Sequence, residues 1–486
     1  MTPLPPTTRP RFLSEADCHD IAQRLARAAQ GGGYTTATIV STWRGNVRWA
    51  RNQISTAGED RNDHVVVNRN LRGAVSPFLE INRISDAALT AAARRAERLA
   101  RLQPEESGFD FVLHVQPEPI TAPPLFSEAT YQLDAGRRAE AARALVQSAT
   151  DAGMLSAGYI EVSAHSMAYI TSWGYARYFQ YTWAQYSVTV RDPTGVGSGW
   201  AGVDWPDWSR IDGPKLSAIA VDKCITSRNP VAIEPGRYTT ILEAQAVCDL
   251  VEQLTGSGLM DRWNGQNGAN EDASRYPFNR TPGAMSPSTG VSQLGETVMD
   301  KRITISADPM DPDLGFPPFE PLSSVTRVYH PAIWIKDGVL VNLAYSHDYA
   351  LRELGRSTGL PNSGAFRMSG GATTVEEMIA TTRRGLLVTR FANVDLTDQK
   401  SLLCRGYTRD GLWLIENGKI SKPVKNMAFT ESVLFALNNV EQLGPPQRVF
   451  HPPGAGAYAW MSIPQPVIVP PLKVRDFSFT ALCDAI

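Results

Sequence analysis

A short strand that runs directly into a helix sets the organisation of this chain. Pro235-Gly236 form a turn, residues 238–242 favour a strand, and residues 243–254 have the apolar spacing of a helix. Just before this run, Asn229-Pro230 interrupts a helical pattern, because the residue before a proline is disfavoured in helices. The chain has 486 residues, more than one hydrophobic core usually organises. We therefore expect two domains that meet near residue 229.

The pattern on both sides of this boundary is typical of an α+β fold. Residues 1–12 are rich in Pro and Thr and are expected to form a flexible tail. Residues 13–228 combine helical patterns with long β-type alternation, which predicts an N-terminal domain of helices packed on an antiparallel sheet. Residues 229–486 are dominated by strand patterns, with helices over 243–254 and near 374–383. They predict a β-rich C-terminal domain.

Capping residues mark where the helices of the N-terminal domain begin. Ser14 is a candidate N-cap for a helix that ends before a run of three glycines. Either Ser85 or Asp86 begins a second helix, which is rich in Ala and Arg. Two further helices are predicted over residues 136–152 and 216–227.

Composition and charge exclude several classes of function. The formal net charge is −2, so the chain lacks the excess of Lys and Arg with which a general nucleic-acid binder replaces counterions. No stretch approaches the roughly 18 apolar residues of a membrane span. The first residues lack the apolar run of a signal peptide, and the five widely spaced cysteines fit reduced thiols. We expect a cytoplasmic protein with no nucleic-acid and no membrane partner.

Residues 235–248 resemble the metal-binding segment of the TldD/PmbA family of peptidases. In that family, a Pro-Gly turn and a short strand lead into a helix that opens with HExxxH. In this chain the same register places Glu243 and Cys248 at the positions of the two histidines, and Ala244 at the position of the glutamate. The family's remaining ligand is a cysteine in a Gly-rich segment near the C-terminus, and the matching residues 452–457 contain none.

The resemblance is spread over much of the chain. It covers residues 195–425 as a series of segments in the family's order, whereas residues 1–190 match only in their pattern of helices and strands. It implies the family's fold, with a C-terminal domain of the TldD/PmbA type and a degenerate metal-site segment at 235–254. The supporting segments are 197–202, 227–230, 294–309, 338–340, 356–359, 374–389 and 415–424.

These substitutions remove the chemistry of a hydrolytic zinc site. A catalytic zinc usually has three protein ligands and an open position for a water molecule, which a nearby carboxylate deprotonates. Glutamate and thiolate can bind zinc in principle, but the methyl group of Ala244 accepts no proton. Glu243 and Cys248 lie five residues apart and would diverge by roughly 140° on an ideal helix. We therefore expect no catalytic residue and no metal ligand in this chain.

Aromatic residues between 169 and 183 form the first candidate surface for a peptide or a partner. Tyr169, Trp173, Tyr175 and Phe179 occupy alternating positions, which places them on one face of a strand or hairpin. Such a face can contact the side chains of an extended peptide. It can also pack against helices or a partner subunit, and packing is the stronger expectation.

A glycine-containing turn near residue 370 is the second candidate surface. Ser369, Gly370 and Gly371 precede a helix that begins near Thr374. Their backbone amides could hold a carboxylate or a peptide carbonyl. A plain turn in which Thr373 or Thr374 caps the helix is the simpler interpretation.

The resemblance implies a role in a two-subunit peptidase. In this family TldD-like chains carry the zinc and TldE (PmbA)-like chains do not, and this chain resembles the second kind. We expect a zinc-less, non-catalytic subunit, with zinc in a TldD-like partner, of a heterodimer that processes or degrades unfolded peptides, including precursors of ribosomally made peptide products. Two alternatives stay open: a stand-alone homodimer that binds peptides, and an enzyme with an atypical site of Glu243, Cys248 and a histidine such as His330 or His347.

Overall fold

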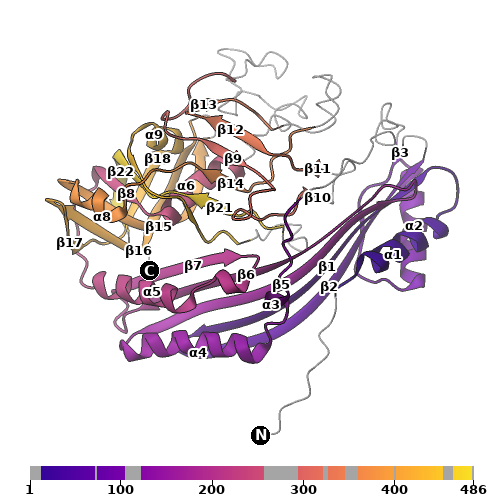
Figure 1. The fold of residues 1–486 in the computed structure, drawn as a ribbon, viewed down its shortest axis with the longest axis horizontal. Helices are drawn as coiled ribbons and strands as arrows, with labels where there is room; N and C mark the ends of the chain where they lie inside the picture. The colour runs from indigo at the N-terminus through magenta and orange to yellow at the C-terminus, as the bar shows by residue number, and fades with distance from the viewer. Residues whose placement is uncertain are drawn as a thin grey trace, which may run out of the picture.

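Two sheet-containing parts follow one another along the chain and lie against each other (Figure 1). The first is a long, curved antiparallel sheet, and the second contains a seven-stranded and a six-stranded sheet around one helix, with a separate two-stranded pair. This combination of helices and sheets confirms the predicted α+β class. The computed structural model describes residues 12–71, 74–103, 122–256, 294–320, 327–344, 359–398, 401–452 and 463–483. Most of the expected tail over residues 1–12 lies outside these ranges.

The first sheet has seven strands in the order β3-β2-β1-β5-β6-β7, and β4 pairs with β2. All of its strand pairs are antiparallel. β1 and β2 are joined by a two-residue turn at Arg51 and Asn52, both with positive φ, as a tight hairpin between long strands requires. The strands are β1 (Tyr34–Ala50), β2 (Gln53–Leu71), β3 (Ala74–Val75), β4 (Leu79–Ile81), β5 (Leu155–Thr171), β6 (Ala176–Arg191) and β7 (Ser198–Trp205).

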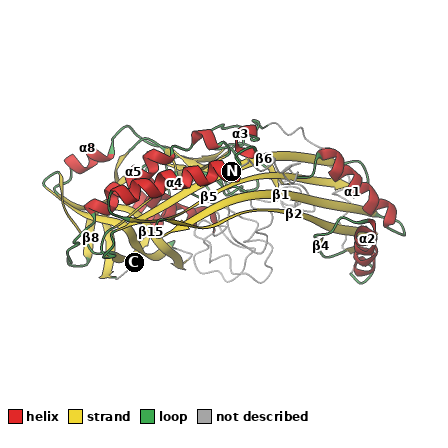
Figure 2. Ribbon diagram, turned by 90° about the horizontal axis from the view of Figure 1, so that it is seen from below, coloured by secondary structure: helices red, strands yellow, loops and turns green. Residues whose placement is uncertain are grey.

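One face of this sheet is apolar, and helices cover it (Figure 2). Successive side chains of a strand point to opposite faces, so every second residue contributes to this core. At one end α1 and α2 pack over Ile39 and Val67, and at the other end α4 and α5 pack over Val47 and Val188. The helices of this part are α1 (Glu15–Ala28), α2 (Asp86–Ala100), α3 (Glu128–Tyr131), α4 (Ala135–Asp151) and α5 (Gly213–Thr226), with a 3₁₀ turn at Trp208–Arg210.

The caps confirm the predicted starts of α1 and α2, whereas α5 begins at Gly213, after its cap Asp212 and three residues before the predicted start. Ser14 and Asp17 form a capping box, in which the Ser14 hydroxyl accepts from the Asp17 N–H at 3.2 Å and the Ser14 N–H donates to the Asp17 carboxylate at 2.8 Å. Ser85 rather than Asp86 is the N-cap of α2. No helix in the described part of the chain is long and apolar enough to cross a membrane.

The second part begins with β8 (Gly236–Leu242), which leads directly into α6 (Ala244–Gly256), as the sequence predicts. β8 lies inside a seven-stranded sheet with the order β15-β8-β22-β18-β16-β17, and β19 pairs with β22. Because β15 also pairs with β16, five of these strands close into a ring. The other strands of this sheet are β15 (Arg384–Asp398), β16 (Leu403–Glu416), β17 (Lys419–Pro423), β18 (Met427–Ser432), β19 (Val440–Leu443) and β22 (Leu472–Leu482).

A six-stranded sheet packs on the other side of α6. Its order is β13-β12-β9-β14-β21-β20, and α6 shares one hydrophobic core with both sheets. The strands are β9 (Ile305–Ala307), β12 (Ala332–Lys336), β13 (Val339–Leu340), β14 (Phe366–Met368), β20 (Gln447–Arg448) and β21 (Val467–Val469). The remaining elements are the pair β10 (Phe319–Glu320) and β11 (Arg327–Val328) and the helices α8 (Val375–Ala380) and α9 (Val433–Asn438).

A buried ion pair joins the two parts. The Asp204 carboxylate of β7 is fully buried, and its Oδ1 accepts from Arg448 Nη2 at 3.1 Å, while Arg448 is 4% exposed. The guanidinium also lies over the rings of Trp183 and Trp205, at 5.2 and 4.3 Å from the ring centres. The N–H of His451 donates to Asp204 Oδ2 at 2.7 Å. Since a buried charge is stable only with partners, the first sheet and the 448–451 segment stabilise each other.

Arg448→Met is expected to destabilise the protein by about 3–5 kcal/mol, because it leaves the Asp204 carboxylate buried without its cation. Urea unfolding followed by circular dichroism measures this change. Arg210→Met is the matched control, since Arg210 also stacks on Trp205 but its ion pair with Asp313 is about half exposed. The control should cost about 0–1 kcal/mol. Equal losses in the two variants would contradict a special role for the buried pair.

Candidate functional site

The first turn of α6 is used to attach this helix to its neighbours. The carboxylate of Glu243 accepts from Lys223 Nζ of α5 at 2.5 Å, and both side chains are largely buried. The Glu243 N–H donates to the carbonyl of Val388 in β15 at 3.0 Å. Glu243 therefore links α5, α6 and β15, and its carboxylate already has a cationic partner.

The three positions that would carry HExxxH do not fit a hydrolytic zinc. Ala244 is 6% exposed and offers no proton acceptor. Cys248 is fully buried in the core around α6, and burial raises the pKa of its thiol well above the ordinary value. Glu243 points to Lys223 instead of joining Cys248 in a ligand group. Ala244 could not remove a proton from a zinc-bound water, because its side chain is a methyl group.

A different group of potential ligands surrounds Cys248. Its Sγ, a carboxylate oxygen of Glu252 and a ring nitrogen of His451 all lie within 4.8 Å of one another. His451 Nε2 is 3.2 Å from Glu252 Oε2, and His451 Nδ1 is 2.7 Å from the carbonyl oxygen of Gln465. Burial alone would lower the pKa of His451, but the Glu252 carboxylate, the carbonyl of Gln465 and the Asp204 carboxylate together raise it above its ordinary value.

Further polar groups hold α6 against the 448–451 segment. Gln245 of α6 makes two hydrogen bonds to the backbone of Phe450, one to its N–H and one to its carbonyl, each at 3.1 Å. Asp249 accepts from Gln245 Nε2 at 2.9 Å and from the N–H of Phe391 at 2.7 Å. Burial raises the pKa of Asp249 to about 7, although Arg390 opposes this shift. One side of α6 is thus a buried polar surface that faces His451.

The aromatic candidates lie near the end of β5, in the turn to β6 and in β6. Tyr169 is buried and meets the ring of Tyr175 edge-on at 5.9 Å, while Trp173 meets Tyr34 at 4.6 Å. Phe179 is partly buried and belongs to a cluster that includes Phe319 of the second part. Of the four candidates only Tyr169 is buried, and Trp173, Tyr175 and Phe179 are partly exposed, so this face is packed in part and accessible in part.

The buried histidine of this face is His165 in β5. Its ring stacks on Tyr181 at 4.6 Å, and its nitrogens lie 3.1 Å from Thr42 Oγ1 and 2.8 Å from Ser163 Oγ. Burial lowers the pKa of His165 to about 3. A neutral imidazole with two hydroxyl partners is a satisfied part of the core, and it needs no catalytic role.

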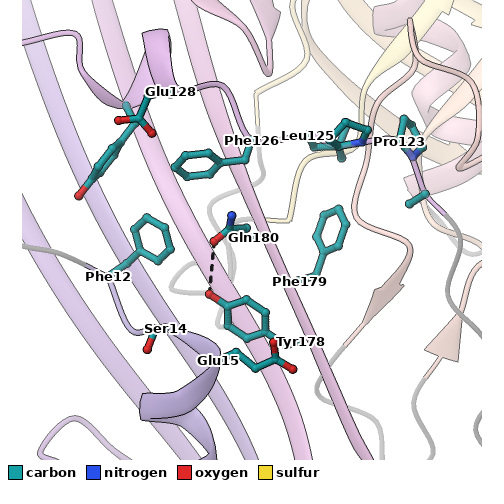
Figure 3. Close-up of a pocket in the computed structure, with 13 residues that line it drawn as sticks. Phe12, Ser14, Glu15, Pro123, Leu125, Phe126, Glu128, Tyr178, Phe179 and Gln180 are labelled. Atoms are coloured by element: carbon teal, nitrogen blue, oxygen red, sulfur yellow. Dashed lines mark hydrogen bonds between the residues drawn. The ribbon is translucent and has the colours of Figure 1, made fainter.

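Phe179 also lines an open groove of about 830 Å³ that runs past the edge of β6 (Figure 3). In the described part of the chain, β7 pairs with β6 only from Ala184 onward, and a single parallel bridge joins Tyr181 to Leu125. Tyr178 and Gln180 lie in the groove on one face of the strand, and Phe179 lies on the other. The lining residues are Phe12, Ser14, Glu15, Ala122, Pro123, Pro124, Leu125, Phe126, Glu128, Tyr131, Tyr178, Phe179 and Gln180.

The edge of β6 in this groove presents backbone hydrogen-bonding groups. The Thr182 N–H donates to the carbonyl of Leu125 at 3.0 Å, so the even-numbered residues of β6 direct their backbone groups away from β5. By this alternation, the N–H and C=O of Tyr178 and the N–H of Gln180 point toward the groove. Aromatic rings beside a strand edge form a surface that suits an extended peptide.

The turn at Ser369, Gly370 and Gly371 is largely occupied by contacts within the chain. The Ser369 N–H donates to the carbonyl of Thr304 and the Gly371 N–H to that of Gly444, each at 2.8 Å. Thr374 is the N-cap of α8 and forms a capping box with Glu377. Two of the three amides are therefore not available to a substrate.

Sequence reasoning did not bring Glu252 and His451 into the site. Cys248 and Glu252 are four residues apart and share one face of α6, which is a detectable signal. His451 is distant in sequence, and only the folded chain brings it to this helix. The group around Cys248 contains neither Glu243 nor His330, and His347 lies outside the described residues.

Solved structures of similar shape cover nearly the whole chain. A proposed modulator of DNA gyrase from Bacteroides thetaiotaomicron has a TM-score of 0.75 and 15% identity, covering 96% of this chain and 100% of that one. A second proposed gyrase modulator, from Thermotoga maritima, has a TM-score of 0.73 and 14% identity over 95% and 100%. TldE from Thermococcus kodakarensis has a TM-score of 0.72 and 13% identity over 95% and 99%. At these identities the likeness establishes the fold alone.

The sequence itself matches a known family in its second part. No curated protein matches the chain. A profile described as the PmbA/TldA metallopeptidase C-terminal domain matches residues 235–481, slightly more than half of the sequence. Its first residue falls at the Pro-Gly turn before β8, where the resemblance in the sequence is most specific. The chain belongs to the PmbA/TldD family of metallopeptidases.

Proposed function

We propose that this chain is the non-hydrolytic subunit of a TldD/TldE-type peptidase complex. The proposal rests on two observations at the start of α6. Glu243 is paired with Lys223, and Ala244 occupies the position where a hydrolytic site needs a base. Hydrolysis by a metal-bound water needs a group that removes its proton. A TldD-like partner with an intact HExxxH would supply both the zinc and that group.

In such a complex this chain would bind the substrate peptide. The groove beside β6 supports this role, because it combines the rings of Phe126, Tyr178 and Phe179 with backbone groups that can pair with an extended chain. Pairing through the backbone is insensitive to sequence, which suits unfolded peptides and the precursors of ribosomally made peptide products. Buried, unbridged thiols such as Cys18 and Cys404 fit a reducing cytoplasm.

The second candidate function is a stand-alone peptide-binding homodimer. The same groove favours it, since the residues that line it all belong to the first part of the chain, whereas the degenerate metal-site segment belongs to the second. The two functions differ in what they require for activity. A subunit of a peptidase needs the TldD-like chain before any peptide bond is broken, whereas a stand-alone binder holds peptides and never promotes their hydrolysis.

Reconstitution with a TldD-like chain tests the lead proposal. The mixture is expected to hydrolyse an unfolded peptide such as reduced, alkylated casein fragments, and replacing the glutamate of the partner's HExxxH should abolish hydrolysis. Ala244→Ser in this chain should leave the rate unchanged within about twofold, because no step depends on position 244. A mixture in which the partner variant keeps full activity, or in which this chain adds nothing to the partner, would overturn the assignment.

Phe179→Ala is expected to weaken the binding of an extended apolar peptide to the isolated chain by about 10-fold or more, since a buried phenyl ring contributes roughly 1.5–3 kcal/mol. Fluorescence anisotropy with a labelled peptide measures the affinity. Trp173→Ala is the control, because Trp173 is an aromatic residue of the same face that does not line the groove. Comparable losses in both variants would exclude the groove as the binding site.

A further inference from the structure

The geometry points to a binding site for a zinc-like divalent cation formed by Cys248, Glu252 and His451. This site shares Cys248 with the HExxxH register, but Glu243 and Ala244 take no part in it, and Glu252 and His451 lie outside that register. It departs from the sequence-based expectation of a chain without a metal ligand. The proposal concerns the binding of a cation and does not require the proposed peptidase role.

The three side chains converge from two segments of the chain. Cys248 and Glu252 are one turn apart on α6, and His451 follows β20. Their donor atoms lie within 4.8 Å of one another. Around a tetrahedral zinc, with bonds of about 2.1–2.3 Å, neighbouring ligand atoms are roughly 3.5 Å apart. Small rotations of the side chains therefore suffice to close the group around an ion.

The imidazole of His451 is already oriented as a metal ligand would be. Its Nδ1 is 2.7 Å from the carbonyl oxygen of Gln465, which fixes the proton on Nδ1. Nε2 is then the nitrogen that can exchange its proton for a cation, and it faces Glu252 and Cys248. The backbone of His451 is held by Asp204, and that of Phe450 by Gln245. The ring is thus positioned by contacts that do not involve the cation.

The donor set selects the class of cation. A thiolate and an imidazole are preferred by Zn²⁺ and Co²⁺, whereas Mg²⁺ and Ca²⁺ prefer oxygen donors alone. Three protein ligands leave a fourth position for water or another ligand. Cys248 is fully buried, whereas the Glu252 and His451 side chains are 36% and 20% exposed, so an ion can approach from the side of this pair.

Such a cation would fasten the junction between the two parts of the molecule. It would link α6 to the 448–451 segment, which Arg448 and His451 attach to Asp204 of the first sheet. Without a cation, Glu252 and His451 form an ion pair beside a neutral thiol. Binding of the cation would release two protons, one from the Cys248 thiol and one from Nε2 of the protonated His451, because zinc binds the thiolate and the neutral imidazole.

Metal binding by the purified full-length chain tests the site. After loading with zinc and gel filtration, about one equivalent should remain by elemental analysis, and Co²⁺ should produce a thiolate-to-metal charge-transfer band. Cys248→Ser should abolish this band, and His451→Gln should weaken cobalt binding by at least about 10-fold. Circular dichroism checks that each variant is folded.

Two matched controls separate this site from other thiols and imidazoles. Cys404→Ser removes another buried cysteine of the same core, and His64→Gln removes another histidine that pairs with a glutamate. Both should keep the charge-transfer band and the affinity. A wild-type protein that shows no thiolate band and retains no zinc would overturn the proposal without reference to any variant, as would bands that survive in Cys248→Ser. None of these results bears on whether the chain supports hydrolysis by a partner.

Discussion

The contacts of the buried Asp204 carboxylate hold the two parts of the molecule together. Asp204 stands in β7 of the first sheet, and its hydrogen-bond donors, Arg448 and the His451 N–H, come from the second part. Removing a carboxylate from water is costly unless such donors compensate for it. The first sheet and the segment after β20 are therefore fixed relative to each other. This fixes in turn the position of His451 beside α6, where Gln245 also holds the neighbouring Phe450.

Local elements of the fold could be predicted from the sequence, because their signals lie within a few residues. The strand and helix over 235–254, the cap at Ser14 and the cap at Thr374 all depend on adjacent side chains and appear as expected. The pairing of Glu243 with Lys223 and the approach of His451 to Cys248 could not be predicted in the same way. Both result from the packing of distant segments, to which periodicity and capping are insensitive.

The aromatic residues illustrate the same limit in one strand. Alternation correctly puts Phe179 and Tyr181 on the same face of β6, but it cannot say what covers each of them. Tyr181 is buried against Phe319, whereas Phe179 reaches the groove because β7 stops pairing with β6 before that point. The length of a neighbouring strand therefore decides whether a ring is part of the core or part of a binding surface.

We propose that the start of α6 attaches this helix to α5 and β15 and does not serve as a hydrolytic centre. The most direct measurement is the hydrolysis of an unfolded peptide by the isolated chain, loaded with zinc and free of any partner, followed by mass spectrometry over many hours. No cleavage above the zinc-only background is expected. Cleavage by the isolated chain that co-elutes with it and stops on addition of a chelator would contradict the claim.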